Sequence, residues 1–547
     1  MKSILFFFIL TLPIQSISQN TVGTLLLTDD ATEGYTFFSP FSGTDAWMVD
    51  NCGNLINHWD RAYRPGLAAY FLDNGLMLRT YKAPLNGPFT SASNAGGIEL
   101  VDWDNNTVWQ YEINTAEWLS HHDAVMMPNG NILTLTWQLV YRDSLVAWGR
   151  NPNDIAVENF MWSERIVELE PIGIDDARIV WEWNIYDHYI QDFDSTKANF
   201  GVVSEHPELF DINLPDLNSS NSNATRDWNH FNAIDYNPQL DQILISVRNS
   251  DEIWILDHSS TTEEAAGHSG GRYGKGGDIL YRWGNASAYE RAAVSEQKLF
   301  GQHGAQWIPA GYPNEGDIII YNNGNGRPGP DYSTVEILTP SQDSAGFYSI
   351  HDTDPFGPEQ SEVLYGEDAS QRFYSPFLSN AQLLSNGHIL INAGSPGDIF
   401  EVNIFGNTVW QYHIPLFGDF PATQGQDVFN NSNFRAYKYL PDYSGFDGID
   451  IEAQEPIENN PAPCMSITSI IEINHEQNQI IYNPHDRIVR IPSFSNPFSL
   501  YILDISGRKV YSGNQDHIKL SHDLASGIYT IILFQNNSRS ERRIFIP

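Results

Sequence analysis

Histidines recur in this sequence two residues before an alanine that opens an apolar segment. His122 precedes Ala124 in this way, and His303 precedes Ala305. An imidazole with one unprotonated nitrogen can attack an electrophile, and near neutral pH it can also give or accept a proton. His121 could serve in place of His122, but the spacing to the alanine favours His122. The shared position indicates equivalent places in a repeated fold.

A third copy of this pattern adds an amide and a guanidinium. His230 and Asn232 precede Ala233, and Arg248 follows the next apolar segment, residues 243–247. In an antiparallel hairpin the second strand returns to the end at which the first began, so we expect Arg248 beside His230. A guanidinium there would offer paired N–H donors to a tetrahedral oxyanion.

Two further copies carry other polar residues before the alanine. These are Asn380 before Ala381 and Arg435 before Ala436. We interpret Asn380 and Arg435 as structural or channel-lining residues. Several other histidines are interpreted as loop or surface residues, among them His258, His268 and His388.

The elements that carry these residues are predicted to be β-strands. Short runs rich in Ile, Val, Trp and Tyr alternate with turns of Gly, Asn, Asp and Pro, and helical periodicity is nearly absent. A hairpin that ends in an aromatic residue recurs, for example at residues 97–111 and 398–412, and a hairpin that begins near the repeated alanine accompanies each copy. Six such pairs predict an all-β, six-bladed β-propeller over residues 19–445. An open β-sandwich or two stacked domains is the alternative.

A closed propeller would bring residues that are distant in sequence into one site. The strand that begins near the alanine can be the innermost strand of its blade, so that its entry residues ring the central channel at one end. The side chains expected to face this shared cavity are His122, His230, Arg248 and His303.

Charge and cysteine content restrict the partners. The chain has 29 Lys and Arg against 68 Asp and Glu, a formal charge of −39. Nucleic-acid binding needs a basic face, so no nucleic acid partner is expected. An anion site must be built locally from Arg, His and backbone N–H groups, which screening by salt makes feasible. Cys52 and Cys464 could pair in an oxidising compartment, but the sequence does not decide this, and no cysteine metal site is present.

The beginning of the chain carries an export signal. Residues 1–18 combine a basic start at Lys2, an apolar run at residues 4–12 and small residues at Ser16 and Ser18, which is typical of a cleaved signal peptide. No other stretch is long and apolar enough to span a bilayer. The mature protein is therefore expected to be soluble and outside the cytoplasm.

The composition changes after residue 445. Residues 446–469 are acidic and rich in Pro and Asn, and we interpret them as a linker to a small β-sandwich-like module at residues 470–547. The module resembles the C-terminal sorting domain of the type IX secretion pathway. The matching residues are Asn483-Pro484, Leu503-Asp504-x-x-Gly507-Arg508-x-Val510, Gly527-Ile528-Tyr529 and Arg543-Ile544. The resemblance implies that the type IX machinery exports the protein across the outer membrane, followed by release or surface attachment.

The larger domain resembles the bacterial aryl-sulfate sulfotransferase family of six-bladed periplasmic propellers. The resemblance covers residues 34–443 and is most specific over residues 280–328, which contain the sequence GQH ending at His303. The segments HHDAVMMPNGN and WNHFNAI also match. The functional positions of the family fall here on His122, His230, Asn232, Arg248 and His303.

The resemblance implies that the GQH histidine takes a sulfuryl group covalently. His303 would be the nucleophile, and Arg248 and Asn232 would hold the sulfuryl oxygens. His122 or His230 would exchange a proton with the phenol oxygen. The implied substrates are a phenolic sulfate donor and a phenol acceptor. No Gly-rich phosphate loop of the G-x-x-x-x-G-K-[ST] type is present, so neither a nucleotide donor nor another cofactor is expected.

Three alternatives remain open. A non-catalytic propeller could bind a glycan or a protein at the cell surface, and the sorting module would fit that equally well. A hydrolase would pass the sulfuryl group to water. Converging histidines could bind zinc or copper, but a guanidinium at Arg248 argues against a cation there, and no metal is expected. Some members of the family carry a cysteine pair near the active site, whereas this sequence has no cysteine between Cys52 and Cys464.

Overall fold

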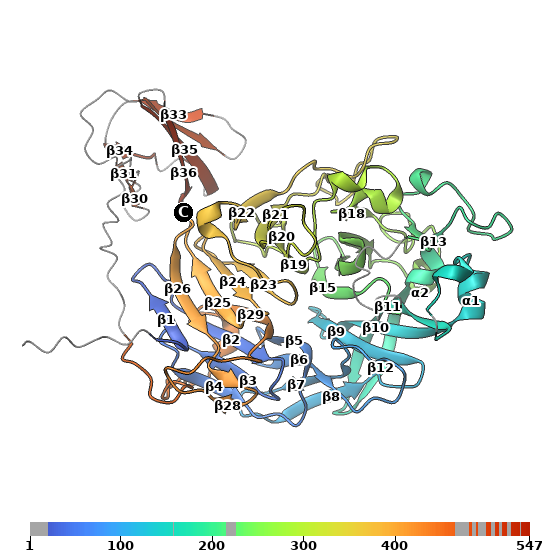
Figure 1. Ribbon diagram of the computed structural model, residues 1–547, viewed down its shortest axis with the longest axis horizontal. Helices are drawn as coiled ribbons and strands as arrows, with labels where there is room; N and C mark the ends of the chain where they lie inside the picture. Colours follow the sequence, from blue (N-terminus) through green and yellow to red (C-terminus); the bar gives the residue numbers. More distant parts are fainter. Residues whose placement is uncertain are drawn as a thin grey trace, which may run out of the picture.

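Strands make up most of the regular structure. The computed structural model describes residues 20–156, 158–214 and 226–464, and parts of 481–546. Its arrangement is all-β and propeller-like (Figure 1), which confirms this part of the predicted fold class. The predicted signal peptide, residues 1–18, lies outside the described residues.

Helices are short in the described part of the chain. The α-helices are α1 (Arg142–Ala147) and α2 (Thr262–Ala265). The 3-10 turns are η1 (Pro152–Asp154), η2 (Ile185–His188), η3 (Val203–Glu205), η4 (Arg248–Ser250), η5 (Ala286–Tyr289), η6 (Val294–Glu296), η7 (Ala369–Gln371) and η8 (Ser444–Phe446). No helix among the described residues is long and apolar enough to span a bilayer.

Units of four antiparallel strands follow one another along the chain. One parallel bridge, between Leu67 and His122, joins the first two units into an eight-stranded sheet. Its strands are β5 (Pro65–Phe71), β6 (Met77–Lys82), β7 (Gly96–Val101), β8 (Thr107–Glu112), β9 (Trp118–Met126), β10 (Ile132–Tyr141), β11 (Phe160–Ile172) and β12 (Asp176–Asn184). The next unit has β15 (Phe231–Asn237), β16 (Gln242–Val247), β17 (Glu252–Asp257) and β18 (Tyr281–Trp283). The one after it has β19 (His303–Trp307), β20 (Ile318–Asn322), β21 (Thr334–Leu338) and β22 (Glu362–Tyr365).

The last two units take strands from both ends of this domain. One contains β23 (Asn380–Leu383), β24 (Ile389–Ala393), β25 (Asp398–Val402), β26 (Thr408–His413) and, at its edge, β1 (Gly23–Leu27). In the other, β29 (Asn433–Tyr439) pairs with β2 (Tyr35–Pro40), followed by β3 (Ala46–Val49) and β4 (Leu55–Trp59). Two short pairs lie in connections: β13 (Tyr189–Ile190) with β14 (Phe210–Asp211), and β27 (Leu416–Phe417) with β28 (Phe420–Pro421).

The first strand of each unit lies at the centre of the arrangement (Figure 1). Each of these inner strands contacts the next, and the last contacts the first, in the order β5, β9, β15, β19, β23, β29 and back to β5. The pairing of β29 with β2 closes this ring, because it joins the end of the domain to its beginning. The entry residues of the inner strands are thereby gathered around one axis.

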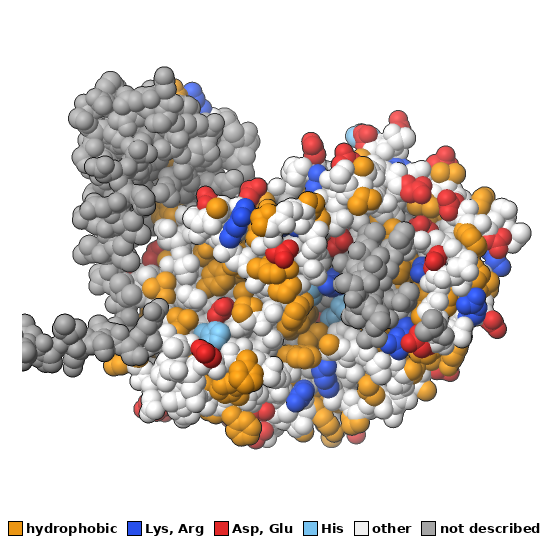
Figure 2. Space-filling view, viewed as in Figure 1, with side chains coloured by type: hydrophobic (Ala, Val, Ile, Leu, Met, Phe, Trp, Pro, Cys, Tyr) orange, Lys and Arg blue, Asp and Glu red, His pale blue; other side chains and the backbone are white. Residues whose placement is uncertain are grey.

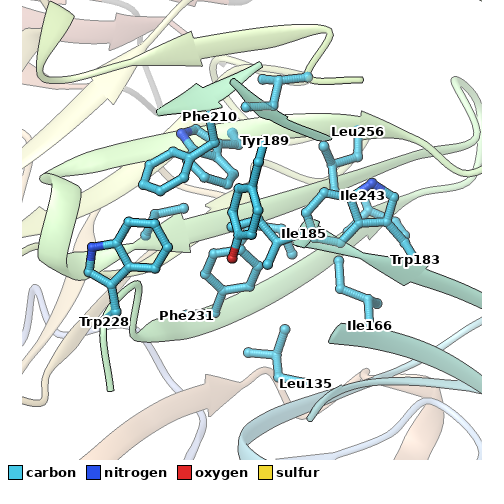
Figure 3. Close-up of a cluster of buried hydrophobic side chains, with 14 of the residues drawn as sticks. Leu135, Ile166, Trp183, Ile185, Tyr189, Phe210, Trp228, Phe231, Ile243 and Leu256 are labelled. Carbon is cyan, nitrogen blue, oxygen red and sulfur yellow. The ribbon is translucent and has the colours of Figure 1, made fainter. Parts of the chain in front are cut away.

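Apolar side chains fill the space between neighbouring units. In the cluster of Figure 3, Trp183 and Ile185 from the β9–β12 unit and the η2 turn lie with Phe231 and Ile243 of the next unit. Each is nearly fully buried. Burial of such a side chain stabilises the fold by about 1.5–3 kcal/mol, so the units are held at fixed positions. Phe231 belongs to this core and directly follows His230, which fixes the backbone at that histidine.

The segment after β29 lies along the ring instead of leaving it. Phe446 packs on Phe71, with 5.1 Å between ring centroids. The backbone of Leu55 in β4 exchanges hydrogen bonds with Gln454 and Glu455. A disulfide then joins Cys464 to Cys52, with their Cα atoms 5.4 Å apart. Part of the predicted linker therefore adds to an edge strand of the ring.

The C-terminal part forms two small sheets. One contains β30 (Ile481–Asn483), β31 (Ile488–Arg490) and β34 (His517–Lys519). The other contains β33 (Lys509–Gly513), β32 (Ser499–Asp504), β35 (Gly527–Gln535) and β36 (Ser538–Ile546). Their buried residues, among them Val489, Leu500, Ile502 and Ile531, form a core cluster of their own.

Removal of the disulfide should destabilise the ring. The variant Cys464→Ser is expected to lose about 2–4 kcal/mol of unfolding free energy, because the unfolded chain gains the entropy that the cross-link removes. Denaturant titration of the purified protein measures this loss. The double variant Cys52→Ser/Cys464→Ser is the control and should match the single one. Equal midpoints for oxidised and reduced wild type would show that the bond contributes nothing.

Candidate active site

His303 presents an unprotonated ring nitrogen. It is the first residue of β19, and only 3% of its surface is exposed. Its Nδ1 lies 3.0 Å from the Gly301 carbonyl oxygen and 2.8 Å from Asn323 Oδ1. Both of these oxygens can only accept, so Nδ1 carries the proton and the neutral ring keeps its lone pair on Nε2.

Asn323 is itself held in one orientation. Its Nδ2 donates to the carbonyl oxygens of Ser375 and Leu378, at 2.8 and 3.1 Å. This leaves Oδ1 facing the ring of His303. The tautomer of the histidine is therefore determined by a buried amide that directly follows β20.

The surroundings keep His303 neutral. Burial lowers the pKa of His303 well below its ordinary value, and the positive charge of Arg248 lowers it further. The hydrogen bonds to Asn323 and Gly301 raise the pKa but do not offset burial. A neutral imidazole with a fixed tautomer is what a nucleophilic histidine requires.

Arg248 lies beside both His230 and His303. It begins η4, directly after β16, and its backbone N–H donates to the His230 carbonyl at 3.2 Å. A Cβ atom at Gly301 would lie 3.8 Å from Arg248 Nη2, so the guanidinium passes over the turn that leads to His303. The side chain is partly buried, where its charge acts more strongly than in water.

Asn232 acts on the same turn from the other side. It is fully buried, and its Nδ2 donates to the Gln302 carbonyl at 2.8 Å. Its Oδ1 has no hydrogen-bond partner among the described residues. The amide therefore fixes the backbone directly before His303.

Three histidines form a hydrogen-bonded chain that ends in a carboxyl group at each side. His121 Nε2 lies 3.0 Å from Glu164 Oε2, and His121 Nδ1 lies 2.8 Å from His122 Nδ1. His122 Nε2 lies 3.2 Å from His230 Nε2, and His230 Nδ1 lies 2.6 Å from Asp227 Oδ2. The three imidazoles therefore form a continuous hydrogen-bonded path from Glu164 to Asp227.

One proton can occupy each contact of this chain. Burial raises the pKa of Glu164 well above its ordinary value, and Asp227 raises it further, so Glu164 is a neutral acid that can donate to His121. Burial lowers the pKa of His121 to about 3 and that of His122 well below its ordinary value, so both rings are neutral. Donation then runs in one direction, from Glu164 to the carboxylate of Asp227.

Irregular backbone at the strand entries aims these side chains. His122 and His230 both have left-handed backbones, with φ of 49° and 56°, and Gly304 after His303 has φ of 60°. The pairing register shifts at each of these places. A β-bulge redirects side chains, and strained non-glycine residues concentrate at functional sites. The shared bulge explains why residues before the repeated alanine meet on the axis.

An aromatic ring lies between the histidines. The Phe434 ring centroid is 6.3 Å from that of His122 and 6.2 Å from that of His303. The side chain of His230 is 20% exposed, whereas His122 and His303 are almost fully buried, so the cluster meets solvent at His230. Histidine side chains are visible near the middle of the face in Figure 2.

Two more of the entry residues make structural contacts. Asn380 exchanges hydrogen bonds with the backbone of Ala436 in the neighbouring strand. Arg435 is buried and forms an ion pair with Asp123, 2.7 Å between Nη2 and Oδ2. A cavity of about 470 Å³ lies beyond this pair, toward later residues of the inner strands such as Val125, Gln306 and Tyr437. No predicted catalytic histidine lines that cavity.

Sequence reasoning missed the residues that support the histidines. Glu164, Asn323 and Asp227 do not precede a repeated alanine, and their sequence neighbourhoods carried no signal. His388, interpreted as a loop or surface residue, lies in the turn before β24 but is buried against Glu401, with 2.7 Å between Nδ1 and Oε1.

The arylsulfotransferase (ASST) family matches residues 44–409, well over half of the 547 residues of the chain. The chain belongs to the arylsulfotransferase family. Residues 480–547 match a secretion system C-terminal sorting domain, which indicates export by the type IX pathway to the cell surface or beyond. Membership of the family implies a sulfotransferase-type enzyme.

Solved structures resemble the chain only distantly. Kuenenia stuttgartiensis hydrazine synthase shares 14% identity with a TM-score of 0.29, over 57% of this chain and 70% of that one. Virginiamycin B lyase from Staphylococcus aureus shares 11% with a TM-score of 0.29, over 72% and 89%. AztD from Citrobacter koseri shares 7% with a TM-score of 0.33, over 75% and 98%. No curated protein matches the chain.

Without the Asn323 amide, the ring of His303 should no longer be held in a single tautomer. The variant Asn323→Ala is expected to lower the kcat of sulfuryl transfer by about 100-fold, because the ring would no longer be held with Nε2 unprotonated. Steady-state kinetics with an aryl sulfate and a phenol measure the change. Asn386→Ala, at an exposed amide, is the control and should retain full activity. Unchanged kcat in Asn323→Ala would show that the tautomer needs no support.

Glutamine should replace Glu164 without loss of stability. A raised folded-state pKa stabilises the fold below the ordinary value of 4.5, and this contribution is lost as pH rises through the folded pKa. Glu164→Gln should therefore be at least as stable as wild type at pH 7 and should lack that decline. Urea titrations at pH 5 and pH 8 compare the two, with Glu170→Gln on the same strand as control. A large loss in Glu164→Gln at both pH values would indicate that the carboxyl group is ionised.

Proposed function

We propose that the protein transfers a sulfuryl group from a phenolic sulfate ester to a phenol through a sulfated His303, without a nucleotide donor. The observation that carries this proposal is the buried, neutral His303 with its lone pair on Nε2, next to the guanidinium of Arg248. Family membership gives the reaction class. The combination suits a nucleophile that attacks an anionic sulfur centre.

The first half-reaction would sulfate His303. Nε2 attacks the sulfur atom, the bond between sulfur and the aryl oxygen breaks, and the phenolate leaves with the bonding pair. By analogy with phosphoryl transfer, charge on the non-bridging oxygens requires a positive partner, which Arg248 supplies. Because the Asn232 N–H group donates to Gln302, we assign Asn232 the role of positioning the backbone before His303.

The chain of histidines would give a proton to the departing phenolate and accept one from the incoming phenol. The proton that His122 Nε2 donates to His230 Nε2 is available to the departing phenolate at the end of the chain that meets solvent, and Glu164 can replace it through His121. In the second half-reaction a phenol returns a proton to the chain. Its oxygen attacks the sulfur atom, the nitrogen–sulfur bond breaks, and His303 is restored. Donor and acceptor use the same site in turn, which is a ping-pong mechanism.

The fold proposal that accompanies this function is a six-bladed propeller with the domain limits given above. The closed contacts among the inner strands support it, if the eight-stranded sheet is counted as two blades. The Phe434 ring between His122 and His303 would offer the phenol a stacking surface.

Replacement of His303 tests the proposal. With a chromogenic aryl sulfate and phenol, His303→Ala should reduce transfer to the background rate, and rapid quenching of wild type with the donor alone should leave one sulfuryl group on His303. The exposed His206 gives the control, His206→Ala, which should retain full activity. Transfer by His303→Ala at the wild-type rate would remove His303 from the mechanism. Equal product formation with and without phenol would indicate a hydrolase.

A further inference from the structure

We propose that His188, His268 and Asp278 form a binding site for a zinc ion at the outer edge of the ring. One ligand atom from each side chain lies within 4.8 Å of the others. His188 ends η2, which follows the outer strand β12, and Asp278 precedes the outer strand β18. His268 lies after α2, on the glycine-rich loop that ends at Asp278. The three residues therefore join neighbouring units of the ring.

The contacts of His188 direct its two ring nitrogens at different partners. Its Nε2 lies 2.8 Å from the Ala265 carbonyl oxygen, which can only accept, so Nε2 carries a proton. Its Nδ1 faces Asp278 Oδ1 at 2.9 Å. A zinc ion bound there would displace the proton that lies between these two atoms and take both of them as ligands.

A second imidazole approaches the same carboxylate oxygen. His268 Nδ1 lies 2.7 Å from Asp278 Oδ1. Ligand atoms of one tetrahedral zinc ion are about 3.3 Å apart, from bond lengths near 2.0–2.1 Å, so a small outward movement of the side chains would admit the ion. Two imidazoles and one carboxylate are typical zinc ligands, whereas calcium and magnesium prefer oxygen ligands alone. A water molecule would complete the coordination.

The surroundings orient the ligands as a metal site does. The ring of His188 stacks on Trp183, with 5.4 Å between centroids and 2° between planes, and the Ala265 carbonyl fixes its tautomer. Such outer contacts are typical of metal-binding histidines. The side chain of His188 is 1% exposed, whereas that of His268 is 61% exposed. One ligand on a glycine-rich loop at the surface leaves a route for the ion to enter.

Another histidine that contacts two carboxylates lacks the geometry of a metal site. His258 contacts Asp241 through Nδ1 and Glu168 through Nε2. Its two nitrogens point in opposite directions, so these carboxylates cannot share one ion with the ring. Only the cluster at Asp278 directs separate ligands to one point among the described residues.

Zinc titration of the chelator-treated full-length protein tests the site. Calorimetry with Zn²⁺ alone should show one saturable site, and Zn²⁺ should raise the melting temperature by a few degrees. His268→Ala should weaken Zn²⁺ binding at least tenfold and abolish the shift in melting temperature, while its exposed position should leave the fold intact. His206→Ala, at another exposed histidine paired with a carboxylate, is the matched control and should bind as wild type does.

A further variant tests whether zinc binds instead at the histidines of the candidate active site. His230→Ala should retain the same zinc affinity, because its side chain is not part of the cluster. Loss of binding in His230→Ala with retention in His268→Ala would overturn the proposal and place the ion in the channel. Absence of saturable Zn²⁺ binding to wild type would overturn it as well. Neither result depends on the outcome of the sulfuryl-transfer assays.

Discussion

The pairing of β29 with β2 determines what lies at the centre of the molecule. It joins strands about four hundred residues apart in sequence and closes the contacts among the inner strands. Phe434 and Arg435 are brought to the axis by this pairing. Arg435 then bonds to Asp123, which directly follows His122, so closure is linked to the position of a site histidine. An open array would leave each histidine on a separate surface.

The electrostatic design of the site is local. A chain of net charge −39 offers no general attraction for a sulfate ester. Arg248 supplies the positive charge, and burial keeps His121, His122 and His303 neutral. A ring of protonated imidazoles would bind sulfate tightly but would have no lone pair to attack it. In the proposed mechanism the binding charge and the nucleophile are therefore on different residues.

The repeated pattern in the sequence singles out the clustered histidines but not the residues that support them. The repeated alanine marks His122, His230 and His303 because each lies at the irregular backbone just before the alanine of an inner strand, and this is a periodic feature. Asn323 reaches the site from the end of β20 and Glu164 from β11, two strands away from β9, so their positions depend on how the strands pack. The same reason explains His388, whose burial comes from a carboxylate thirteen residues away. The sequence did not decide whether Cys52 and Cys464 pair, because they are 412 residues apart and are brought together only in the folded ring.

The disulfide also changes the covalent topology of the enzyme. With Cys52 bonded to Cys464, the chain from the first strands of the ring to its last segment is a closed covalent loop. Proteases act on exposed loops, and a protein delivered to the cell exterior meets them. A single cut anywhere within the loop would open the chain but release neither part. The ring could keep its catalytic centre assembled after damage that would divide an unbridged propeller.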